Sequence, residues 1–255
     1  SSDFKNLQKA IQKIVFETSS HDQNIFKKKY WKWQYEDLPS KKSHVYLIIL
    51  KEKIIGYYHI PIFQIIIKNK NYKIGNVQSV AVLKKYRNKG FFEKLLMHAN
   101  NDVKKHIDLI YTFPNDKSIH TFLKYGNFVN IQTLPTYIYF IKFTNIFYTK
   151  FKIRLPSIVD KIINFFSNLN NLKLTKKDSI KKIKIDFQDN INLFKNYSNN
   201  HNIHLTRNLK FLNWRYCDSP KSDYLCYGIF TNGKLKASLV LKIDELFSNK
   251  GIIVM

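Results

Sequence analysis

The stretch Asn76–Leu96, NVQSVAVLKKYRNKGFFEKLL, carries more information about this chain than any other. Its first part, Val77–Leu83, is an apolar run with the length and composition of a buried strand. A short basic loop follows and ends at Gly90, one of only seven glycines in 255 residues. A helix is expected to begin directly after this glycine. The chain therefore passes from a strand through a basic loop straight into a helix.

This loop has the composition of a phosphate-binding site. The N–H groups in the first turn of a helix have no partner within the helix, and the helix dipole adds partial positive charge there. Gly90 permits a close approach of the backbone to a ligand. Full charges come from Lys84, Lys85, Arg87 and Lys89. The alternative is a surface turn with solvated lysines.

The segment resembles motif A of the GNAT acyltransferases, whose pyrophosphate loop has the pattern Q/R-x-x-G-x-G/A. Phe92 stands here where the second small residue is usual. The resemblance implies that the loop binds the pyrophosphate of acetyl-CoA or another acyl-CoA, and that the preceding strand pairs its backbone with the pantetheine arm. The implied cofactor-binding residues are Val80, Ala81 and Val82 of the strand and Arg87, Asn88, Lys89, Gly90, Phe91 and Phe92 of the loop.

A second segment, Ile110–Phe128, resembles motif B of the same family, N-x-x-A/S-x-x-x-F/Y-x-x-x-G. The residues in register are Asn115, Ser118, Phe122 and Gly126. The resemblance implies that Asn115 and Ser118 lie beside the CoA arm. Many members carry, at the position of Phe122, a tyrosine that protonates the leaving thiolate. Tyr125 is near in sequence but is expected on another face of the helix, so the usual acid is absent or replaced.

The residues that carry out catalysis stay unassigned by the sequence. Direct acyl transfer needs an unprotonated amine held against the thioester, a route for the amine proton, and a donor that polarises the carbonyl oxygen. The weak candidates are His59, Gln78, Ser79 and Tyr125. For His59 a buried or edge position with a structural hydrogen bond is favoured over a catalytic role.

The charge of the chain invites a nucleic-acid interpretation, because the formal net charge is +25. Only four of the 43 basic residues are arginine, however, whereas nucleic-acid sites favour arginine for bidentate contacts. The abundance of Asn, Ile, Phe, Tyr and Lys is typical of an A/T-rich coding bias. A nucleic-acid partner is therefore not expected for the leading function.

The cysteines and the hydropathy indicate a cytoplasmic protein without a metal. Cys217 and Cys226 form no disulfide framework and fit a reducing compartment. Together with His201 and His204 they match no standard zinc spacing. No apolar run approaches the ~20 residues of a membrane span, and no signal peptide is recognisable. The chain starts at Ser1 without a methionine and stops inside an apolar run, so we expect a fragment at both ends.

An internal repeat relates two distant parts of the chain. Trp33–Pro39 and Trp214–Pro220 share the pattern W-x-Y-x-D-x-P. A helical stretch precedes each copy and a strand–turn–strand pattern follows each, with Asn232-Gly233 as a strong hairpin signal in the second. Repeats of this size indicate duplicated domains. The aromatic residues of the first copy, with Trp31, are expected either to wall an acceptor pocket or to be a packing signature of the fold.

The fold class predicted is α+β: a GNAT fold with a mixed, mostly antiparallel central sheet flanked by helices, followed by a partial second GNAT-like domain. The domains expected are residues 1–143 for acyl-CoA binding, 144–180 as a helical connector, and 181–255 as the start of the second domain. The elements expected in the first copy are helices between Phe4 and Trp33, a hairpin over His44–Ile67, strand Lys73–Leu83, helix Phe91–Val103, strand Ile107–Thr112, helix Lys117–Tyr125 and strands between Phe128 and Phe143. In the second copy a strand is expected at Lys182–Phe187.

The segment Tyr137–Phe166 is aromatic and basic, and two interpretations were open. It could be an interfacial helix on an anionic membrane. A connector packed between domains is favoured, because Pro156 breaks the run and the apolar residues after it have ordinary core spacing.

The leading function is an acyl-CoA-dependent N-acyltransferase acting on a primary amine of a small molecule, with an amino sugar of surface-polysaccharide metabolism as the acceptor class indicated. Two alternatives stay open. One is an aminoacyl-tRNA-dependent transferase of the tandem-GNAT type, in which the charge would engage tRNA. The other is a degenerate GNAT binding module without turnover.

Overall fold

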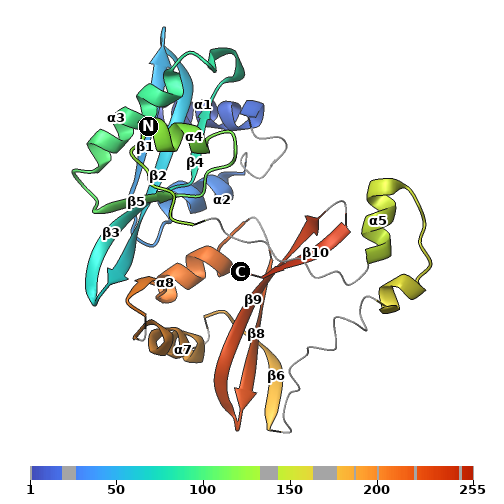
Figure 1. The fold of residues 1–255 in the computed structure, drawn as a ribbon. Coiled ribbons are helices and arrows are strands. Elements are labelled where there is room, and N and C mark those ends of the chain that lie inside the picture. The colour runs from blue at the N-terminus through green and yellow to red at the C-terminus, as the bar shows by residue number, and fades with distance from the viewer. Residues whose placement is uncertain are drawn as a thin grey trace. The chain divides into compact units, whose positions relative to one another are not determined.

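The computed structural model of the chain describes residues 2–18, 27–132, 143–162, 177–186, 188–199, 201–220, 223–246 and 249–254. The chain divides into two compact units. Unit 1 consists of Ser1–Ile131 and Phe194–Lys221, and unit 2 of Gln132–Leu193 and Ser222–Met255. The elements of each unit can be followed in Figure 1.

Unit 1 contains both helices and strands, with four consecutive strands, β1 to β4, after its first helices. Its elements are α1 (Ser2–Thr18), α2 (Lys28–Trp31), the π-helix η2 (Lys32–Glu36), β1 (Ser43–Leu50), β2 (Lys53–Ile67), β3 (Lys70–Val77), β4 (Ser79–Val82), the 3-10 helix η3 (Lys84–Tyr86), α3 (Phe91–Val103), β5 (Leu109–Thr112), α4 (Ile119–Tyr125), β7 (Ile203–Leu205), α8 (Leu209–Leu212) and the π-helix η4 (Asn213–Cys217).

The six strands of unit 1 form one mixed sheet around the long strand β2. The path is β1-β2-β3-β5, and β4 and β7 also pair with β2. Only the β3–β5 pairing is parallel; the others are antiparallel. The predicted α+β class with a mixed, mostly antiparallel sheet is confirmed for this unit.

Helices cover both faces of the sheet, and successive side chains of β2 point alternately toward one face and the other. Tyr58 and Ile60 face α3 and α4 and pack with Leu96 and Phe122. Tyr57 faces the other way, in the cluster that Ile14 of α1 joins. Neighbouring tyrosines of one strand therefore have opposite surroundings, which matters for the site below.

A third cluster joins the two copies of the repeat within unit 1. The rings of Trp33 and Trp214 stack with centroids 5.1 Å apart. Each indole N–H donates to the backbone oxygen of the other tryptophan, that of Trp214 at 2.9 Å. Both residues lie in π-helices, η2 and η4, and both are buried. The two motifs thus pack on each other reciprocally.

Most predicted elements of unit 1 are confirmed, with three differences. The hairpin is present as β1 and β2, and helix Phe91–Val103 has the predicted bounds. The single strand predicted over Lys73–Leu83 is wrong, because Gln78 separates β3 from β4. The predicted helix up to Trp33 continues as the π-helix η2. The strands predicted between Phe128 and Phe143 fall partly on residues 133–142, outside the described part, and residues 127–132 contain no strand.

Unit 2 contains a four-stranded antiparallel sheet with the order β10-β9-β8-β6. Its elements are α5 (Phe143–Phe151), β6 (Asp178–Ile183), β8 (Tyr224–Thr231), β9 (Lys234–Leu246) and β10 (Asn249–Val254), while α7 (Gln188–Asn199) runs across the division. The strand predicted at Lys182–Phe187 is wrong in its bounds, because β6 ends at Ile183.

The aromatic segment Tyr137–Phe166 is described only between residues 143 and 162, where α5 forms. Within the described residues, the structure contains no helix of the length and apolar character that crossing a membrane requires.

Candidate active site

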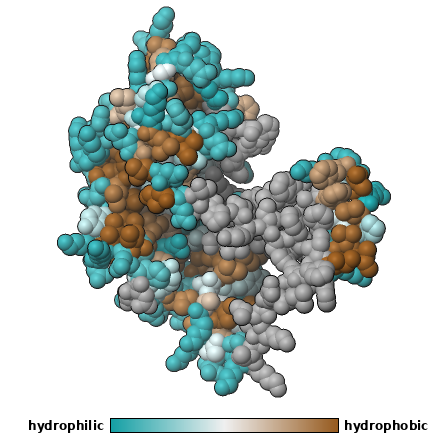
Figure 2. All heavy atoms as spheres, in the orientation of Figure 1, coloured by the Kyte–Doolittle hydropathy of each residue, from teal (hydrophilic) through white to brown (hydrophobic). Residues whose placement is uncertain are grey.

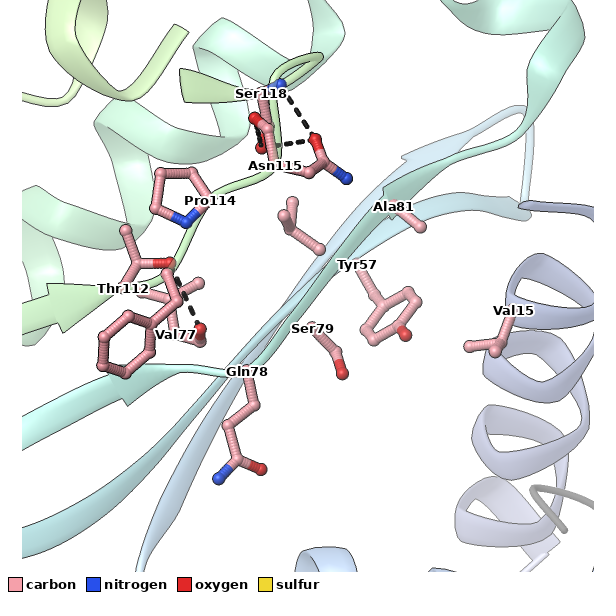
Figure 3. Close-up of a pocket in the computed structure, with 12 residues that line it drawn as sticks. Val15, Tyr57, Val77, Gln78, Ser79, Ala81, Thr112, Pro114, Asn115 and Ser118 are labelled. Carbon is pink, nitrogen blue, oxygen red and sulfur yellow. Dashed lines mark hydrogen bonds between the residues drawn. The ribbon is translucent and has the colours of Figure 1, made fainter. Parts of the chain in front are cut away.

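The site begins where two parallel strands separate. The β3–β5 pairing ends at Val77 and Thr112, and the Thr112 hydroxyl donates to the Val77 oxygen at 3.3 Å. Beyond Gln78, β4 continues along β2, and among the described residues it pairs with no other strand. The chain after Thr112 runs into α4 instead. The two segments therefore diverge and leave a cavity of about 250 Å³ between them (Figure 3).

Twelve residues line this cavity, which is called the cofactor cavity below. They come from α1, β2, the β3–β4 segment and the β5–α4 connection: Val15, Tyr57, Val77, Gln78, Ser79, Val80, Ala81, Thr112, Phe113, Pro114, Asn115 and Ser118.

The free edge of β4 offers backbone groups to the cavity. Leu83 N–H donates to the Ile55 oxygen at 2.9 Å, so by antiparallel alternation Ala81 also bonds to β2. Val80 and Val82 then direct their N–H and C=O groups away from β2. The Val82 oxygen accepts a hydrogen bond from Arg87 Nε at 3.0 Å. Val80 lines the cavity, so its backbone is the part of this edge that a bound chain can meet.

The basic loop connects β4 to α3 in an unusual backbone conformation. Asn88 has φ 58° and Gly90, the N-cap of α3, has φ 73°. No side chain caps the helix, so the N–H groups of its first turn have no side-chain acceptor. A Cβ on Gly90 would meet no atom within 4 Å. The space in front of the helix N-terminus is thus open.

The cations of the loop form no ion pair in the described part of the chain, although Glu93 lies in the first turn of α3. Lys84, Lys85, Arg87 and Lys89 are exposed. The two ion pairs that the described residues form lie elsewhere, at Lys32–Asp37 and at Lys105–Asp102. Four cations against the single carboxylate of Glu93, together with an uncapped helix N-terminus, favour an anionic ligand.

Phe92, the departure from the family's loop pattern, does not obstruct this space. Its ring packs against the core and meets Phe122 at a centroid distance of 5.7 Å, edge to face. Phe122 in turn is 2% exposed. Both phenylalanines therefore serve the packing between α3 and α4, and the backbone of the loop is left accessible.

Asn115 and Ser118 stand on the opposite wall of the cofactor cavity. The Asn115 Oδ1 accepts from the Ser118 N–H at 3.1 Å and from its hydroxyl at 3.0 Å. This arrangement fixes the Asn115 side chain, and Figure 3 shows its amide nitrogen pointing away from Ser118. A donor is thereby held in place beside the cavity.

A second, smaller cavity of about 40 Å³ adjoins the first and is called the aromatic cavity below. Val15, Tyr57 and Ser79 line both cavities. The remaining walls of the aromatic cavity come from α1, α2 and η2: Ile11, Gln12, Tyr30, Trp31, Gln34 and Tyr35. Trp31 and Tyr35, from the sequence motif, thus line a cavity, whereas Trp33 packs on Trp214.

Polar groups meet at the junction of the two cavities. The Tyr57 hydroxyl lies close to the hydroxyls of Tyr35 and Ser79, close enough for both to influence its pKa. Gln34 Nε2 donates to Ser79 Oγ at 3.5 Å. Burial raises the pKa of Tyr57 and of Tyr35 far above the usual value of a tyrosine, so both hydroxyls keep their protons at any physiological pH.

Two other catalytic candidates of the sequence lie away from both cavities. His59 is completely buried, stacks on Tyr35 at 4.2 Å and lines neither cavity. Burial lowers its pKa to about 3, and neither ring nitrogen has a hydrogen-bond partner among the described residues. The structural hydrogen bond expected for His59 is therefore not found there. Tyr125 ends α4, and its ring lies under Lys124 Nζ.

Tyr57, Thr112 and Val15 are site residues that the sequence did not single out. Tyr57 lies in an apolar strand that reads as buried throughout. The available signal was the pair Tyr57-Tyr58, since alternation must turn one of two adjacent hydroxyls toward each face of the sheet.

A metal site is not seen in the part of the chain that the structure describes, where no group of three or more His, Cys, Asp or Glu side chains could hold an ion. Cys217 is exposed and Cys226 is buried, and both are free thiols.

The comparison with protein families decides what this arrangement is. Residues 2–127 match the model of the GNAT acetyltransferase domain. Residues 2–127 form a GNAT acetyltransferase domain. They contain the strand divergence, the basic loop and both cavities. The predicted GNAT fold is confirmed for this part of the chain, and the match to an acetyltransferase domain supports the predicted acyltransferase class.

Solved structures with the same fold extend over nearly the whole chain. One, from Enterococcus faecalis, is described as a conserved protein of unknown function and probable N-acyltransferase; it has TM-score 0.59 and 14% identity and covers 94% of this chain and 53% of that one. A GCN5-related N-acetyltransferase from Anabaena variabilis has TM-score 0.58 and 11% identity, covering 100% and 55%. The N-myristoyltransferase of Saccharomyces cerevisiae, with bound myristoyl-CoA, has TM-score 0.55 and 15% identity, covering 95% and 58%.

These likenesses concern the fold, given their low identity. The present chain spans somewhat more than half the length of each of these three proteins. No curated protein matches the chain in sequence.

Proposed function

We propose that this chain is an N-acyltransferase that uses an acyl-CoA, with acetyl-CoA as the acyl donor expected, to acylate a primary amine of a small molecule. The observation that carries the proposal is the free edge of β4, which diverges from β5 and leads directly into the uncapped N-terminus of α3. The extended pantetheine arm of an acyl-CoA can pair with the strand edge, and its pyrophosphate can bind the helix N-terminus that follows.

The geometry suggests how the cofactor would be held. The pyrophosphate would accept hydrogen bonds from the first-turn N–H groups of α3, and Arg87 and the three lysines would add charge. The pantetheine arm would run along β4 and pair with the backbone of Val80, as one strand pairs with another. On the opposite wall, the Asn115 amide would donate to a carbonyl of the arm. Ala81, Val82, Asn88, Lys89, Phe91, Phe92 and Ser118 complete the proposed cofactor-binding set.

The acceptor would enter through the aromatic cavity. Its aromatic walls, Trp31 among them, offer apolar surfaces of the kind that pack on sugar rings, while Gln34 and Ser79 offer polar groups. These features support an amino sugar as the acceptor class, with the amine directed toward the junction at which the cofactor cavity ends. A cytoplasmic location fits the two free cysteines.

We further propose that the chain has a tandem arrangement, in which residues 181–255 belong to a second GNAT-like copy. The reciprocal packing of Trp33 and Trp214 supports it, because equivalent residues of both motifs make equivalent contacts. The structural likeness over 94–100% of the chain supports it as well. Residues 1–143, 144–180 and 181–255 remain the proposed first domain, connector and partial second domain.

Two alternative functions are also tested by the experiments below. A transferase that uses aminoacyl-tRNA is motivated by the net charge of +25, but the open loop favours a pyrophosphate ligand over it. A binding module without turnover is motivated by Phe122 at the usual position of the catalytic acid.

Calorimetry with acetyl-CoA tests the cofactor site. Gly90→Glu would place a carboxylate beside the pyrophosphate; two unit charges ~4 Å apart repel by about 4 kcal/mol near a protein surface, so affinity should fall about 100-fold or more. Gly233→Glu is the matched control, because Gly233 has φ 77° and equally open surroundings in the β8–β9 turn. It should bind as the wild type does.

Three outcomes would contradict parts of this proposal. Absence of acetyl-CoA binding by the wild type would refute the acyl-CoA function. Unchanged binding by Gly90→Glu would refute the assignment of the loop. A salt-sensitive complex with aminoacyl-tRNA in place of acetyl-CoA binding would favour the tRNA-dependent transferase.

A further inference from the structure

The proton that the amine must lose has no evident carboxylate or imidazole to receive it. The described residues that line the two cavities include no Asp, Glu or His. His59, the nearest imidazole on β2, is fully buried behind Tyr35 and lines neither cavity. Hydroxyl groups are the proton-carrying side chains that the junction does contain.

One hydroxyl occupies the junction itself. Tyr57 lines both cavities and is 3% exposed. It pairs across the sheet with Ala81, on the strand whose free edge would hold the pantetheine arm. Figure 3 shows its ring beside the Ser79 side chain, in the space between the strands and Val15 of α1. A group in this position meets an amine from one cavity and a thioester from the other.

The neighbours of Tyr57 restrict the position of its hydroxyl. The Tyr35 ring lies between Trp31 and His59, with centroid distances of 4.2 Å on both sides. The hydroxyls of Tyr35 and Ser79 both lie close to that of Tyr57. A clamped ring can present its hydroxyl without losing further side-chain entropy, so the three hydroxyls form a preorganised cluster.

We propose that Tyr57 and Ser79 form a neutral proton shuttle for acyl transfer, with Tyr57 as the catalytic residue that receives the amine proton. This inference rests on the acyl-CoA function proposed above. Tyr35 acts as a positioning residue, because its hydroxyl faces Tyr57 and would act on the reacting atoms only through it.

The step balances without any ionised side chain. The amine nitrogen forms a bond to the thioester carbon, and the carbon–sulfur bond breaks with its electron pair going to sulfur. The amine N–H proton passes to the Tyr57 oxygen, the Tyr57 proton passes to the Ser79 oxygen, and the Ser79 proton passes to sulfur. The products are an amide and free CoA thiol, and both hydroxyls are restored.

Burial fits a shuttle better than it fits a stepwise acid or base. Because burial raises the pKa of Tyr57, forming a tyrosinate would be costly. In a shuttle, Tyr57 gains one proton while it gives up another, so no tyrosinate forms. Because this shuttle delivers a proton to the sulfur, it would not require the tyrosine that many GNAT proteins carry at the position of Phe122.

The test compares two adjacent tyrosines of β2. Tyr57→Phe removes the proposed shuttle, and Tyr58→Phe is the matched control, since Tyr58 faces the other side of the sheet and bonds to Asn100 at 3.3 Å. Acetyl-CoA affinity is measured by calorimetry, and CoA thiol release is measured with glucosamine, glycinamide and hydroxylamine as acceptors. We expect Tyr57→Phe to bind acetyl-CoA within about twofold of the wild type and to lose about 100-fold or more in kcat. Tyr58→Phe should keep kcat within about threefold.

A double variant separates catalysis from structure. Tyr35→Phe should lower kcat about tenfold with KM nearly unchanged, and Tyr35→Phe/Tyr57→Phe should be no slower than Tyr57→Phe alone, because Tyr35 acts through Tyr57. Additive losses in the double variant, or a Tyr57→Phe variant with kcat within threefold of the wild type, would overturn the shuttle. A wild type that binds acetyl-CoA but releases no thiol with any of the three amines would also overturn it while leaving the cofactor site intact. Failure to bind acetyl-CoA would instead refute the proposed function itself.

Discussion

Replacing Trp214 with alanine should destabilise unit 1 severely, although Trp214 lies far along the chain from the matched GNAT domain. Trp214 is 5% exposed and packs in a cluster with Trp33, Phe63 and Phe211. Its indole N–H donates to the Trp33 oxygen. The variant removes a large buried ring and this hydrogen bond together.

The expected loss follows from these two contributions. Truncation of a buried Phe or Trp to Ala costs about 3–5 kcal/mol, and the lost hydrogen bond adds about 1 kcal/mol. The Trp33 N–H keeps its partner, because it donates to the backbone oxygen of residue 214. We therefore expect the free energy of unfolding to fall by about 4–6 kcal/mol, a large part of the ~5–15 kcal/mol that typical domains possess.

Urea unfolding followed by far-ultraviolet circular dichroism measures this loss without depending on tryptophan fluorescence. Trp214→Phe keeps an aromatic ring but no donor, and should lose about 2 kcal/mol. Leu209→Ala, in the neighbouring helix α8, is the control; its side chain is 44% exposed, so a loss below about 1 kcal/mol is expected. A loss below 1 kcal/mol in Trp214→Ala would show that the two tryptophans do not pack together in solution, and would refute the reasoning.

Three further variants probe the buried histidine, the sheet and the loop. His59 has a folded-state pKa of about 3 against about 6.5 when unfolded, so its contribution to stability is complete above pH 6.5 and is lost as the pH falls. Between pH 7 and pH 5, urea titrations should show that the free energy of unfolding falls by about 2 kcal/mol more in the wild type than in His59→Phe. Equal losses in the two proteins would contradict the burial of the neutral ring. Gly75→Ala would bring a Cβ within 2.7 Å of Ile60 and Ile107, so unfolding experiments should show a loss of about 1–3 kcal/mol, and a neutral result would mean that the two isoleucines repack freely. Arg87→Lys keeps the charge but loses the bond to Val82, so calorimetry should show about threefold to tenfold weaker acetyl-CoA binding, whereas Arg154→Lys should bind normally.

The sequence was sufficient for the elements whose signals are local. Helix α3 has the predicted bounds because Gly90 begins it and the apolar spacing continues to Val103. The β1–β2 hairpin follows from two apolar runs separated by a polar turn. The departures at Phe92 and Phe122 were also visible, but their meaning was not, because only the packed structure directs both rings into the core.

The missing part of the site depends on contacts between distant residues. The apolar run through Val77–Leu83 reads as one strand, and only the parallel partner β5, which ends at Thr112, reveals the break at Gln78. Tyr57 becomes a site residue because η2 brings Tyr35 against it and β4 brings Ser79. Strand β7 joins β2 from more than 130 residues away, at a pairing that no local pattern specifies.

Apolar side chains also remain on the surface around β5 and α4. Leu109, Phe113, Leu123 and Val129 are exposed to 42–80%, and Figure 2 shows apolar atoms gathered on that side of unit 1, among polar ones. Composition alone could not have located them, since the same residue types fill the core.

The repeated motif shows how one sequence pattern can serve two purposes at once. The tryptophan of each copy faces its counterpart, and this reciprocal contact requires the same residue in the same π-helical turn in both copies. The tyrosine two residues further on points to the opposite side of the helix, away from that contact. In the first copy this places Tyr35 against Tyr57 and the aromatic cavity. The shared tryptophan is therefore explained by packing alone, whereas the role proposed for Tyr35 depends on partners from β2 and β4, so the motif by itself predicts the contact between the copies and not the chemistry.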